Sequence, residues 1–322
     1  AGKYITQEGY DNSSTRMMPA DTVMIALTGA TAGKVGYLNF AACGNQSITG
    51  ILPCGALNQR YLFYYLISQR HKILADCVGG AQAHISQGYV KNIKVPVLSL
   101  VEQEQVVEVL TQLNNIISMR RKEIGLLDTL VKSRFAEMFG DVKYGTERWG
   151  GKPFKDITIN LDSKRKPVKD ADRKKMQGIY PYYGATGIVD YVNDYRQDGD
   201  FLLISEDGKA LELRSKPIAF LASGKIWVNN HAHVQQCTDE CNMIYLMYHI
   251  NFMDISIWVT GIDQKKLNRA NLDIIPIALP PIELQNQFAD FVVSVDKSKS
   301  KIQKSLEETQ LLFDSLMQKY FG

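Results

Sequence analysis

The stretch VPVLSLVEQEQVVEVLTQLNN, residues 95–115, leads to LVKSRFAEMFG at residues 130–140. The same layout returns in IPIALPPIELQNQFADFVVSV, residues 275–295, and LFDSLMQKYFG, residues 312–322. Each copy runs from a β-like stretch with proline, through a Glu/Gln-rich helix start, into a long helix that ends in Phe-Gly. A repeat of this kind decides the architecture, because it means that the chain contains one structural unit twice.

A 4-3 spacing of apolar residues runs along both predicted helices. The stripe includes Leu110, Leu113, Ile117, Ile124 and Leu127 in the first helix, and Val292, Val295, Ile302, Leu306 and Phe313 in the second. One narrow apolar stripe on a helix needs a partner helix. Polar residues interrupt the stripes at different slots, namely Arg120 and Arg134 in the first and Lys299 and Thr309 in the second. We therefore expect two unlike seams that face each other in an antiparallel coiled coil, with helices roughly 55–60 Å long.

The alternative is two ordinary amphipathic helices, each packed only on its own domain. Five heptads without a proline, and with only Gly125 as a possible break, are long for such helices. The spacing therefore favours the paired arrangement.

A globular segment precedes each helix. Apolar β-like runs occupy residues 23–27, 35–38 and 48–52 in the first segment, and residues 201–204, 218–222 and 226–228 in the second. Short helices are expected at residues 61–73 and 242–258. The fold class is therefore α/β (α+β), with domains of mixed strands and short helices at residues 1–98 and 141–281 and spacer helices at residues 99–140 and 282–322. Aligning Asp21 with Asp200 leaves residues 141–179 without a counterpart, so we expect the first domain to be N-terminally incomplete.

The composition narrows the class of protein. A chain of 322 residues with 45% hydrophobic and 22% charged residues is typical of a soluble globular protein of two domains. A net charge of +3 is too small to predict nucleic-acid binding by itself. Five cysteines favour free thiols in a reducing cytosol over a zinc site. No apolar run reaches the roughly 20 residues of a membrane span, and residues 1–20 lack the core of a signal peptide, so we expect a cytoplasmic protein.

A basic stretch, DSKRKPVKDADRKK at residues 162–175, is the strongest candidate for contacts with phosphates. Its candidate residues are Lys164, Arg165, Lys166, Arg173, Lys174 and Lys175, with Tyr182 and Tyr183 shortly after. The alternative is a solvated charged loop, since three aspartates are interleaved with the cations. The neighbouring tyrosines and Gly184 favour a nucleic-acid surface.

Amide, hydroxyl and imidazole groups form the second set of candidates, because such groups can hydrogen-bond to base edges. The set consists of Asn229, Asn230 and His231 in the second copy and Asn45, Gln46 and Ser47 in the first, with Lys209, Thr28, Thr31 and Lys34 nearby. Each residue of the two triplets, Asn229–His231 and Asn45–Ser47, has an equally good structural explanation, which is to cap strands and satisfy buried backbone groups.

Three signals typical of enzymes are weak. GATAGK at residues 29–34 is one residue short of a phosphate loop, and Val35 replaces the Ser/Thr that should follow. No carboxylate pattern completes a metal site around His231 and His233. Asp207-Gly208-Lys209 lacks an evident upstream acidic residue for a nuclease site. We therefore predict no catalytic residue, no metal and no cofactor in this chain.

Several segments together resemble the specificity subunit of type I restriction-modification systems. They are YPYYGATGIVDYVNDYRQDGDFLLISEDGK (180–209) and SGKIWVNNHAHV (223–234) in the second copy, and MIALTGATAGKVGYLNF (24–40), CGNQSITGILP (43–53) and GGAQAHISQGYVKNIKVPV (79–97) in the first. The resemblance extends over essentially the whole chain, and the order of recognition domain, Pro-plus-Glu/Gln entry and helix is specific.

The resemblance implies a non-catalytic subunit that binds double-stranded DNA. Each domain would read one half of a bipartite site in the major groove, and the helices would set the distance between the half-sites. It also implies two modification subunits that carry S-adenosylmethionine and methylate adenine, and restriction subunits that use ATP and Mg²⁺. Two other hypotheses stay open: a helical strut with two peptide-binding lobes, and an enzyme with its own methyltransferase or nuclease site.

Overall fold

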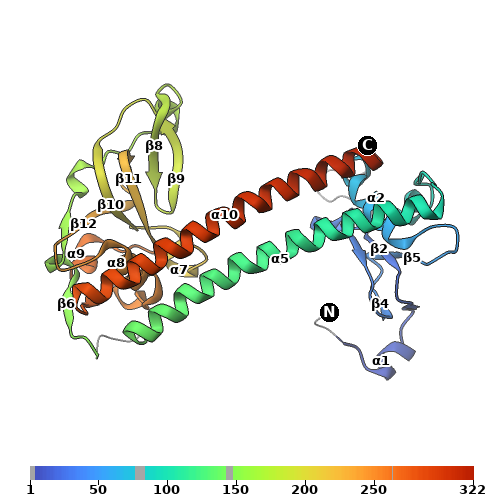
Figure 1. Ribbon diagram of the computed structural model, residues 1–322, viewed down its shortest axis with the longest axis horizontal. Helices are drawn as coiled ribbons and strands as arrows, with labels where there is room; N and C mark the ends of the chain where they lie inside the picture. Colours follow the sequence, from blue (N-terminus) through green and yellow to red (C-terminus); the bar gives the residue numbers. More distant parts are fainter. Residues whose placement is uncertain (1–3, 77–83, 143–147, 263) are drawn as a thin grey trace. The chain divides into compact units, whose positions relative to one another are not determined.

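The computed structural model describes residues 4–76, 84–142, 148–262 and 264–322 (Figure 1). The start of the motif at residues 79–97 lies outside these ranges. The chain divides into two compact units: unit 1 contains Ala1–Glu123 and Ile302–Gly322, and unit 2 contains Ile124–Lys301. Each unit therefore consists of one globular segment together with parts of both long helices.

The two long helices are α5, Leu100–Phe139, and α10, Ile282–Phe321. In unit 1, Val106 and Leu110 near the start of α5 share a core with Met317 and Phe321 at the end of α10. The start of one helix thus lies beside the end of the other, which is the antiparallel order expected from the sequence.

The same order holds in unit 2, where the end of α5 meets the start of α10. Val131 and Phe135 share a core with Val292 and Phe288, and the rings of Phe135 and Phe288 have centroids 5.3 Å apart in edge-to-face contact. Each helix packs both on a globular segment and on the other helix. The alternative in which each helix packs only on its own domain is therefore wrong.

The predicted seam residues are covered to different degrees. Five are buried: Leu110, Ile117, Val292, Val295 and Leu306. Five are half-buried: Leu113, Ile124, Leu127, Ile302 and Phe313. The polar interruptions find partners across the seam. Arg120 donates to the carbonyl of Ser305 at 2.5 Å and to the hydroxyl of Thr309, and Lys299 Nζ lies 2.5 Å from Asp128 Oδ1.

Unit 2 is built on a six-stranded sheet. The strand order is β7 (Thr158–Asn160), β12 (Ala232–Cys237), β10 (Gln197–Ser205), β11 (Ala219–Val228), β8 (Gln177–Gly184) and β9 (Gly187–Val192). All neighbours are antiparallel except β11 and β8. Alternate residues of β10 face different cores: Leu202 and Ile204 face the helices, whereas Phe201 and Leu203 face a smaller core.

The remaining elements of unit 2 complete its core and its edges. They are β6 (Gly151–Pro153), which pairs with β13 (Pro276–Ala278), η2 (Phe154–Asp156), η3 (Asp162–Lys164), α6 (Asp170–Arg173), α7 (Lys209–Leu213), α8 (Met243–Phe252), η4 (Ser256–Trp258) and α9 (Arg269–Asp273). The runs at residues 218–222 and 226–228, expected as separate strands, belong to the single strand β11. Gly224, with φ +78°, lies inside that strand, and a glycine tolerates this conformation without steric cost.

Unit 1 is smaller. Its three-stranded antiparallel sheet has β2 (Val23–Ala26) between β3 (Val35–Tyr37) and β5 (Ile48–Ile51). The other elements are α1 (Gln7–Asp11), β1 (Met17–Met18), which pairs with β4 (Ala42–Cys43), η1 (Gly29–Thr31), α2 (Gln59–Ser68), α3 (Arg70–Ala75) and α4 (Gln87–Lys91). The single helix expected at residues 61–73 is thus two helices, α2 and α3. Helix α2 packs on the start of α5 and the end of α10.

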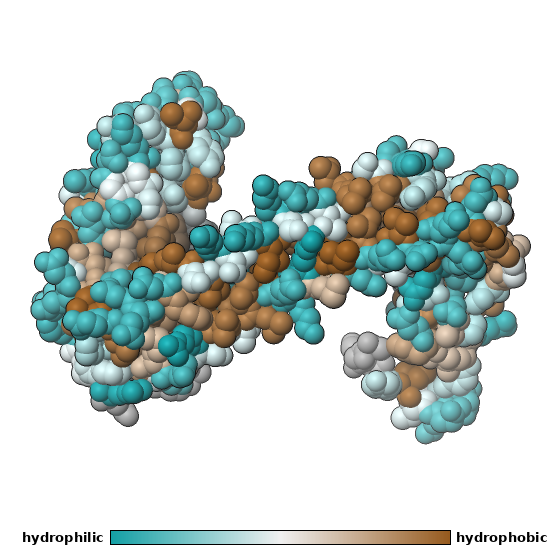
Figure 2. All heavy atoms as spheres, viewed as in Figure 1, coloured by the Kyte–Doolittle hydropathy of each residue, from teal (hydrophilic) through white to brown (hydrophobic). Residues whose placement is uncertain are grey.

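Three further observations concern the exposed apolar side chains, the absence of a membrane-spanning helix among the described residues, and the cysteines. Apolar side chains lie at the surface along both long helices (Figure 2). Within the described residues, no helix combines the length and the apolar character needed to cross a membrane. The described cysteines, Cys43, Cys54, Cys237 and Cys241, are free thiols.

Candidate nucleic-acid interface

In unit 1, three segments that are distant in sequence meet at one end of the sheet. Leu27, just after β2, donates its backbone N–H to the carbonyl of Ser47 at 2.8 Å. The carbonyl of Leu27 accepts from the backbone N–H of Ile85, also at 2.8 Å. The GATAGK segment, the GNQS segment and the segment around Ile85 are therefore side by side.

Unit 2 repeats this arrangement with the same hydrogen bonds. Glu206, just after β10, donates its backbone N–H to the carbonyl of His231 at 2.9 Å, and its carbonyl accepts from Leu267 N–H at 2.8 Å. Leu27 and Glu206 are thus equivalent positions, which agrees with the alignment of Asp21 on Asp200. We call the place where the three segments meet the motif edge of each unit.

Each motif edge contains a turn closed by an asparagine side chain. Asn45 Oδ1 accepts from the backbone N–H of Ser47 at 3.0 Å, and Asn229 Oδ1 accepts from that of His231 at 2.8 Å. Such a side-chain-to-backbone bond fixes a turn. Both asparagines therefore have the structural role that the sequence left open, and the residues between, Gln46 and Asn230, are exposed.

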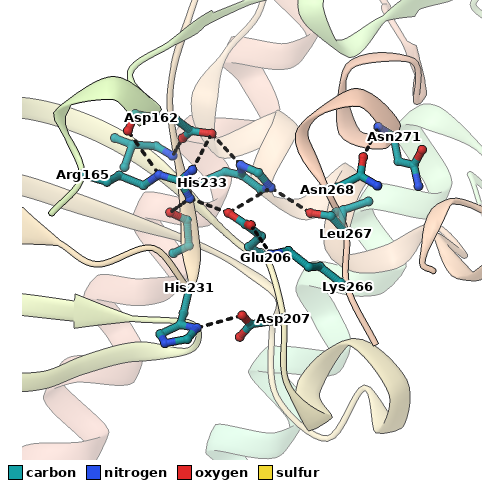
Figure 3. Close-up of polar contacts among 12 residues, drawn as sticks. Asp162, Arg165, Glu206, Asp207, His231, His233, Lys266, Leu267, Asn268 and Asn271 are labelled. Atoms are coloured by element: carbon teal, nitrogen blue, oxygen red, sulfur yellow. Dashed lines mark hydrogen bonds and ion pairs between the residues drawn. The ribbon is translucent and has the colours of Figure 1, made fainter. Parts of the chain in front are cut away.

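The motif edge of unit 2 carries a cluster of charged side chains (Figure 3). Arg165 pairs with Glu206 at 2.5 Å and with Asp162 at 3.3 Å. The fully buried His233 lies between Asp162 Oδ2, 2.7 Å from its Nδ1, and the carbonyl of Leu267, 2.9 Å from its Nε2. Lys266 Nζ is 3.0 Å from Glu206.

These contacts shift the ionisation of two carboxyl groups. Burial alone would raise the pKa of Asp162, but hydrogen bonds from His233 and Val234 and the charge of Arg165 hold the pKa below its usual range. Burial would also raise the pKa of Glu206, but hydrogen bonds from Arg165 and Lys266 lower it below its usual value. Both groups are therefore carboxylates that tie the basic loop to the sheet.

Asp207 and His231 form a second pair beside this cluster, with 2.8 Å between Asp207 Oδ2 and His231 Nδ1 (Figure 3). The His231 side chain is 46% exposed, so it can reach a ligand. The carboxylate partners of the two histidines could not be predicted from the sequence, because they lie in other segments. Among the described residues, no group of three or more His, Cys, Asp or Glu side chains could hold a metal ion.

The basic loop, residues 162–175, crosses one face of the sheet. The indole Nε1–H of Trp227 donates to the carbonyl of Lys166 at 2.7 Å, and the backbone N–H of Val168 donates to the hydroxyl of Tyr182 at 2.9 Å. Lys164 and Lys166 are exposed. Lys174 and Lys175 are also exposed and have only weak, solvated partners in Asp170 (3.1 Å) and Asp172 (3.9 Å).

Several candidate DNA contacts have structural roles, and this corrects their assignment. Arg165 is paired inside the cluster, and Arg173 is paired with Asp190 and Asp170, both at 2.7 Å. Tyr182 and Tyr183 are buried on opposite sides of β8, in separate cores. These side chains and that of Asn229 are therefore held by contacts within the unit and support the surface from below.

The other candidates lie at the surface. Lys209 begins α7 and is exposed, as is Lys34. Thr31 is exposed and donates weakly to the carbonyl of the half-buried Thr28, with 3.4 Å between the oxygens. Ser47 is half-buried in its turn. The structure therefore brings Thr28, Thr31, Lys34 and the Asn45–Ser47 turn to one edge.

Sequence reasoning missed four residues on the face crossed by the basic loop. The guanidinium of Arg196 lies over the ring of Trp227, with 5.0 Å from Cζ to the centroid, and Lys225 Nζ lies 4.7 Å from the ring centroid of Tyr195. The signal was present as basic residues next to aromatic ones, Tyr195-Arg196 and Lys225-Ile226-Trp227, but the pairing becomes visible only in the folded sheet.

Relatives of this chain can be identified by sequence. A type I restriction enzyme specificity subunit of Haemophilus influenzae is 38% identical over 136 residues, which is 42% of this chain and 34% of that protein. The EcoprrI specificity subunit of Escherichia coli is 22% identical over 314 residues, 89% of this chain and 74% of that protein. The matched part thus spans about a third of the Haemophilus relative.

A solved structure supports the same grouping at the level of the fold. The S subunit of a type I restriction-modification system from M. genitalium is 17% identical and superposes with a TM-score of 0.66 over 95% of this chain and 84% of that one. The family model described as type I restriction modification DNA specificity domain matches residues 3–126 and 146–309. Since these two matches cover most of the chain and take in both motif edges, the chain belongs to the type I restriction modification DNA specificity family.

Proposed function

We propose that this chain is the DNA sequence-recognition subunit of a type I restriction-modification complex, and that each unit reads one half of a bipartite site. The observation that carries the proposal is the duplicated motif edge. Two units hold the same three segments together by equivalent hydrogen bonds, and the residue at the tip of each turn, Gln46 or Asn230, carries an amide and is exposed. Two equivalent reading edges in one chain suit a target with two halves.

The side chains at these edges match the chemistry of duplex DNA. Asparagine and glutamine amides can donate and accept at the same time, as the edge of adenine in the major groove requires. The exposed lysines of the basic loop in unit 2 would contact phosphates and fix the register of the domain on the duplex. Phosphate contacts of this kind make the affinity fall steeply with salt.

The proposed role is non-catalytic. Methylation of adenine would take place on modification subunits that carry S-adenosylmethionine, with the target base flipped into their pocket. Restriction subunits would supply the steps that require ATP and Mg²⁺. The purified chain alone should therefore neither methylate nor cut DNA when S-adenosylmethionine or Mg²⁺ is supplied.

The long helices offer a place for the modification subunits, of which we propose two. Helix α5 exposes Met119, Leu126 and Leu130, and α10 exposes Leu311 and Leu312. Apolar side chains left open on helices whose seam is already filled are typical of a surface that a partner covers. We therefore propose that the outer faces of α5 and α10 bind the modification subunits.

Methylome sequencing of cells that carry this chain and its modification subunit tests the proposal. The expected result is methylated adenine in a bipartite motif with a fixed spacer, which disappears when the gene for this chain is deleted. A methylome that is unchanged by the deletion would refute the proposed function. Activity of the purified chain alone would show instead that it is an enzyme.

A further inference from the structure

Trp227 contacts two cationic residues on the face of unit 2 crossed by the basic loop. Its indole N–H donates to the carbonyl of Lys166 at 2.7 Å, and its ring lies under the guanidinium of Arg196. The ring itself is only 3% exposed. A buried aromatic group thus serves as a rigid support for residues at the surface.

The backbone on both sides of Trp227 strengthens this support. Arg196 donates its backbone N–H to the carbonyl of Ile226 at 2.9 Å, and Lys166 donates its backbone N–H to the carbonyl of Val228 at 3.1 Å. The two cationic residues are therefore bonded to the neighbours of Trp227 on either side along β11. Little backbone freedom is left to lose when a ligand binds.

Neither cation is neutralised within the part of the chain that the structure describes. No carboxylate lies within 4 Å of the Lys166 ammonium or the Arg196 guanidinium there, in contrast to Arg165 and Arg173 on the same face. Two acidic residues, Asp194 and Asp198, are equally near Arg196 in sequence, and Asp194 accepts a hydrogen bond from the backbone N–H of Tyr195 at 2.8 Å. Both cations are exposed to solvent, so their charge is available to a ligand.

We propose that Lys166 and Arg196, held by Trp227, form a binding site for the phosphate backbone of duplex DNA. This site rests on the proposed function and adds to it a contact that carries no sequence information. A guanidinium held over an aromatic ring keeps its planar set of N–H donors, which suits the oxygens of a phosphate. The site would orient unit 2 on the duplex, while the motif edge would read the bases.

The test measures DNA binding by the complex of this chain with its modification subunits. The probes are one duplex that contains the methylated motif and one with that motif scrambled, each titrated at several salt concentrations. Because each phosphate contact contributes about 0.9 to the slope of log affinity against log salt, Arg196→Gln and Lys166→Gln should each reduce the slope by about that amount. Both variants should weaken binding to the two duplexes equally.

Three further variants separate the support from the charge. Arg196→Lys keeps the charge and should keep the slope close to that of the wild type. Trp227→Phe removes the indole donor to Lys166 but keeps a ring under Arg196, so it should act like a partial loss of the Lys166 contact. Lys216→Gln, an exposed lysine just before the other end of β11, is the matched control and should leave the slope unchanged.

The outcomes distinguish this site from the proposed function. If the wild-type complex binds the motif but Arg196→Gln and Lys166→Gln leave affinity and slope unchanged, the phosphate site is refuted and the recognition function stands. If either variant weakens binding to the motif duplex more than binding to the scrambled duplex, the residue reads bases and the proposal is wrong. If the wild-type complex does not bind duplex DNA, the recognition function itself fails, and this site with it.

Discussion

In unit 1, the side-chain oxygen of Gln103 accepts a hydrogen bond of 2.8 Å from the backbone N–H of Asn58. Gln103 lies in the first turn of α5, and its amide nitrogen also donates to the carbonyl of Leu98. The side chain of Asn58 in turn caps α2 by accepting from two backbone N–H groups. One buried amide therefore joins the start of α5 to the start of α2.

Unit 2 has the same joint, in which Gln285 of α10 accepts from the backbone N–H of Asn242 at 2.8 Å and Asn242 caps α8. We predict that Gln285→Leu lowers the free energy of unfolding by about 2 kcal/mol or more, because it leaves the N–H of the half-buried Asn242 and the buried carbonyl of Pro280 without their partner. Denaturant unfolding measures the loss. Gln287→Leu, an exposed neighbour on the same helix, should change stability little, and an equal loss in both variants would contradict the assigned role.

The seam between the long helices makes a second prediction. Ile117 is 3% exposed, whereas Leu113 and Ile124 are half-buried, so Ile117 is the more sensitive position for a charge. Ile117→Asp should cost about 3 kcal/mol or more, since an unpaired carboxylate would be buried. Met119→Asp, two residues further along and 57% exposed, should stay within about 0.5 kcal/mol of the wild type. Equal unfolding midpoints for the two variants would show that Ile117 is not in the seam.

The helices and their pairing could be predicted because they follow from local periodicity. A 4-3 repeat is visible in any stretch of sequence, and its interruptions pointed to a partner with a matching pattern. The pairing of Lys299 with Asp128 and of Arg120 with Thr309 needed the register of the two helices, which no local pattern contains. The joints at Gln103 and Gln285 were missed for a similar reason, since each contact spans more than forty residues.

The candidate site was predicted less well than the fold. Residue type alone could not show that Arg165 is neutralised by Glu206, which is 41 residues away. The sequence suggested that Tyr182 and Tyr183 lie side by side on a surface. In the structure, the two side chains are buried in two different cores. The pairing of β8 with β9 also shifts its register between these two residues. The motif edge itself was anticipated as three separate motifs, and only the fold brings them together.

The buried His249 makes the stability of unit 2 depend on pH. Complete burial lowers the pKa of His249 to about 3, and its Nε2 accepts from the backbone N–H of Ala278 at 3.2 Å. The folded state therefore holds the neutral ring, whereas the unfolded chain takes up a proton as the pH falls below about 6.5. The contribution of His249 to the free energy of unfolding is therefore fully present above pH 6.5 and is lost as the pH falls toward 3.

Between pH 7.5 and 5, we expect the free energy of unfolding to fall by about 2 kcal/mol through His249. His249→Gln removes the titration and should flatten this part of the pH profile, whatever its effect on the absolute stability. His71→Gln, an exposed histidine of unit 1, should keep the wild-type profile. A His249→Gln protein whose stability still falls as steeply would assign the pH dependence to other groups.

The last prediction concerns the turn of each motif edge, where adjacent residues have different roles. In unit 2, Asn229 closes the turn with its buried side chain, and Asn230 at the tip is exposed. Asn230→Ala should leave stability within about 0.5 kcal/mol of the wild type. It should relax the methylated motif at one position of one half-site, because a lost base contact is worth roughly 1–3 kcal/mol of discrimination. Asn229→Ala should instead destabilise unit 2 by about 1 kcal/mol through the lost hydrogen bond.

Gln46→Ala in unit 1 should act in the same way as Asn230→Ala, but on the other half of the motif. Methylome sequencing of cells that carry each variant measures both effects in one experiment. If Gln46→Ala and Asn230→Ala relax the same half-site, the two units do not read separate halves. If both variants keep the motif unchanged while Asn229→Ala only destabilises the protein, the turns are structural throughout, and base reading belongs to other residues of the surface.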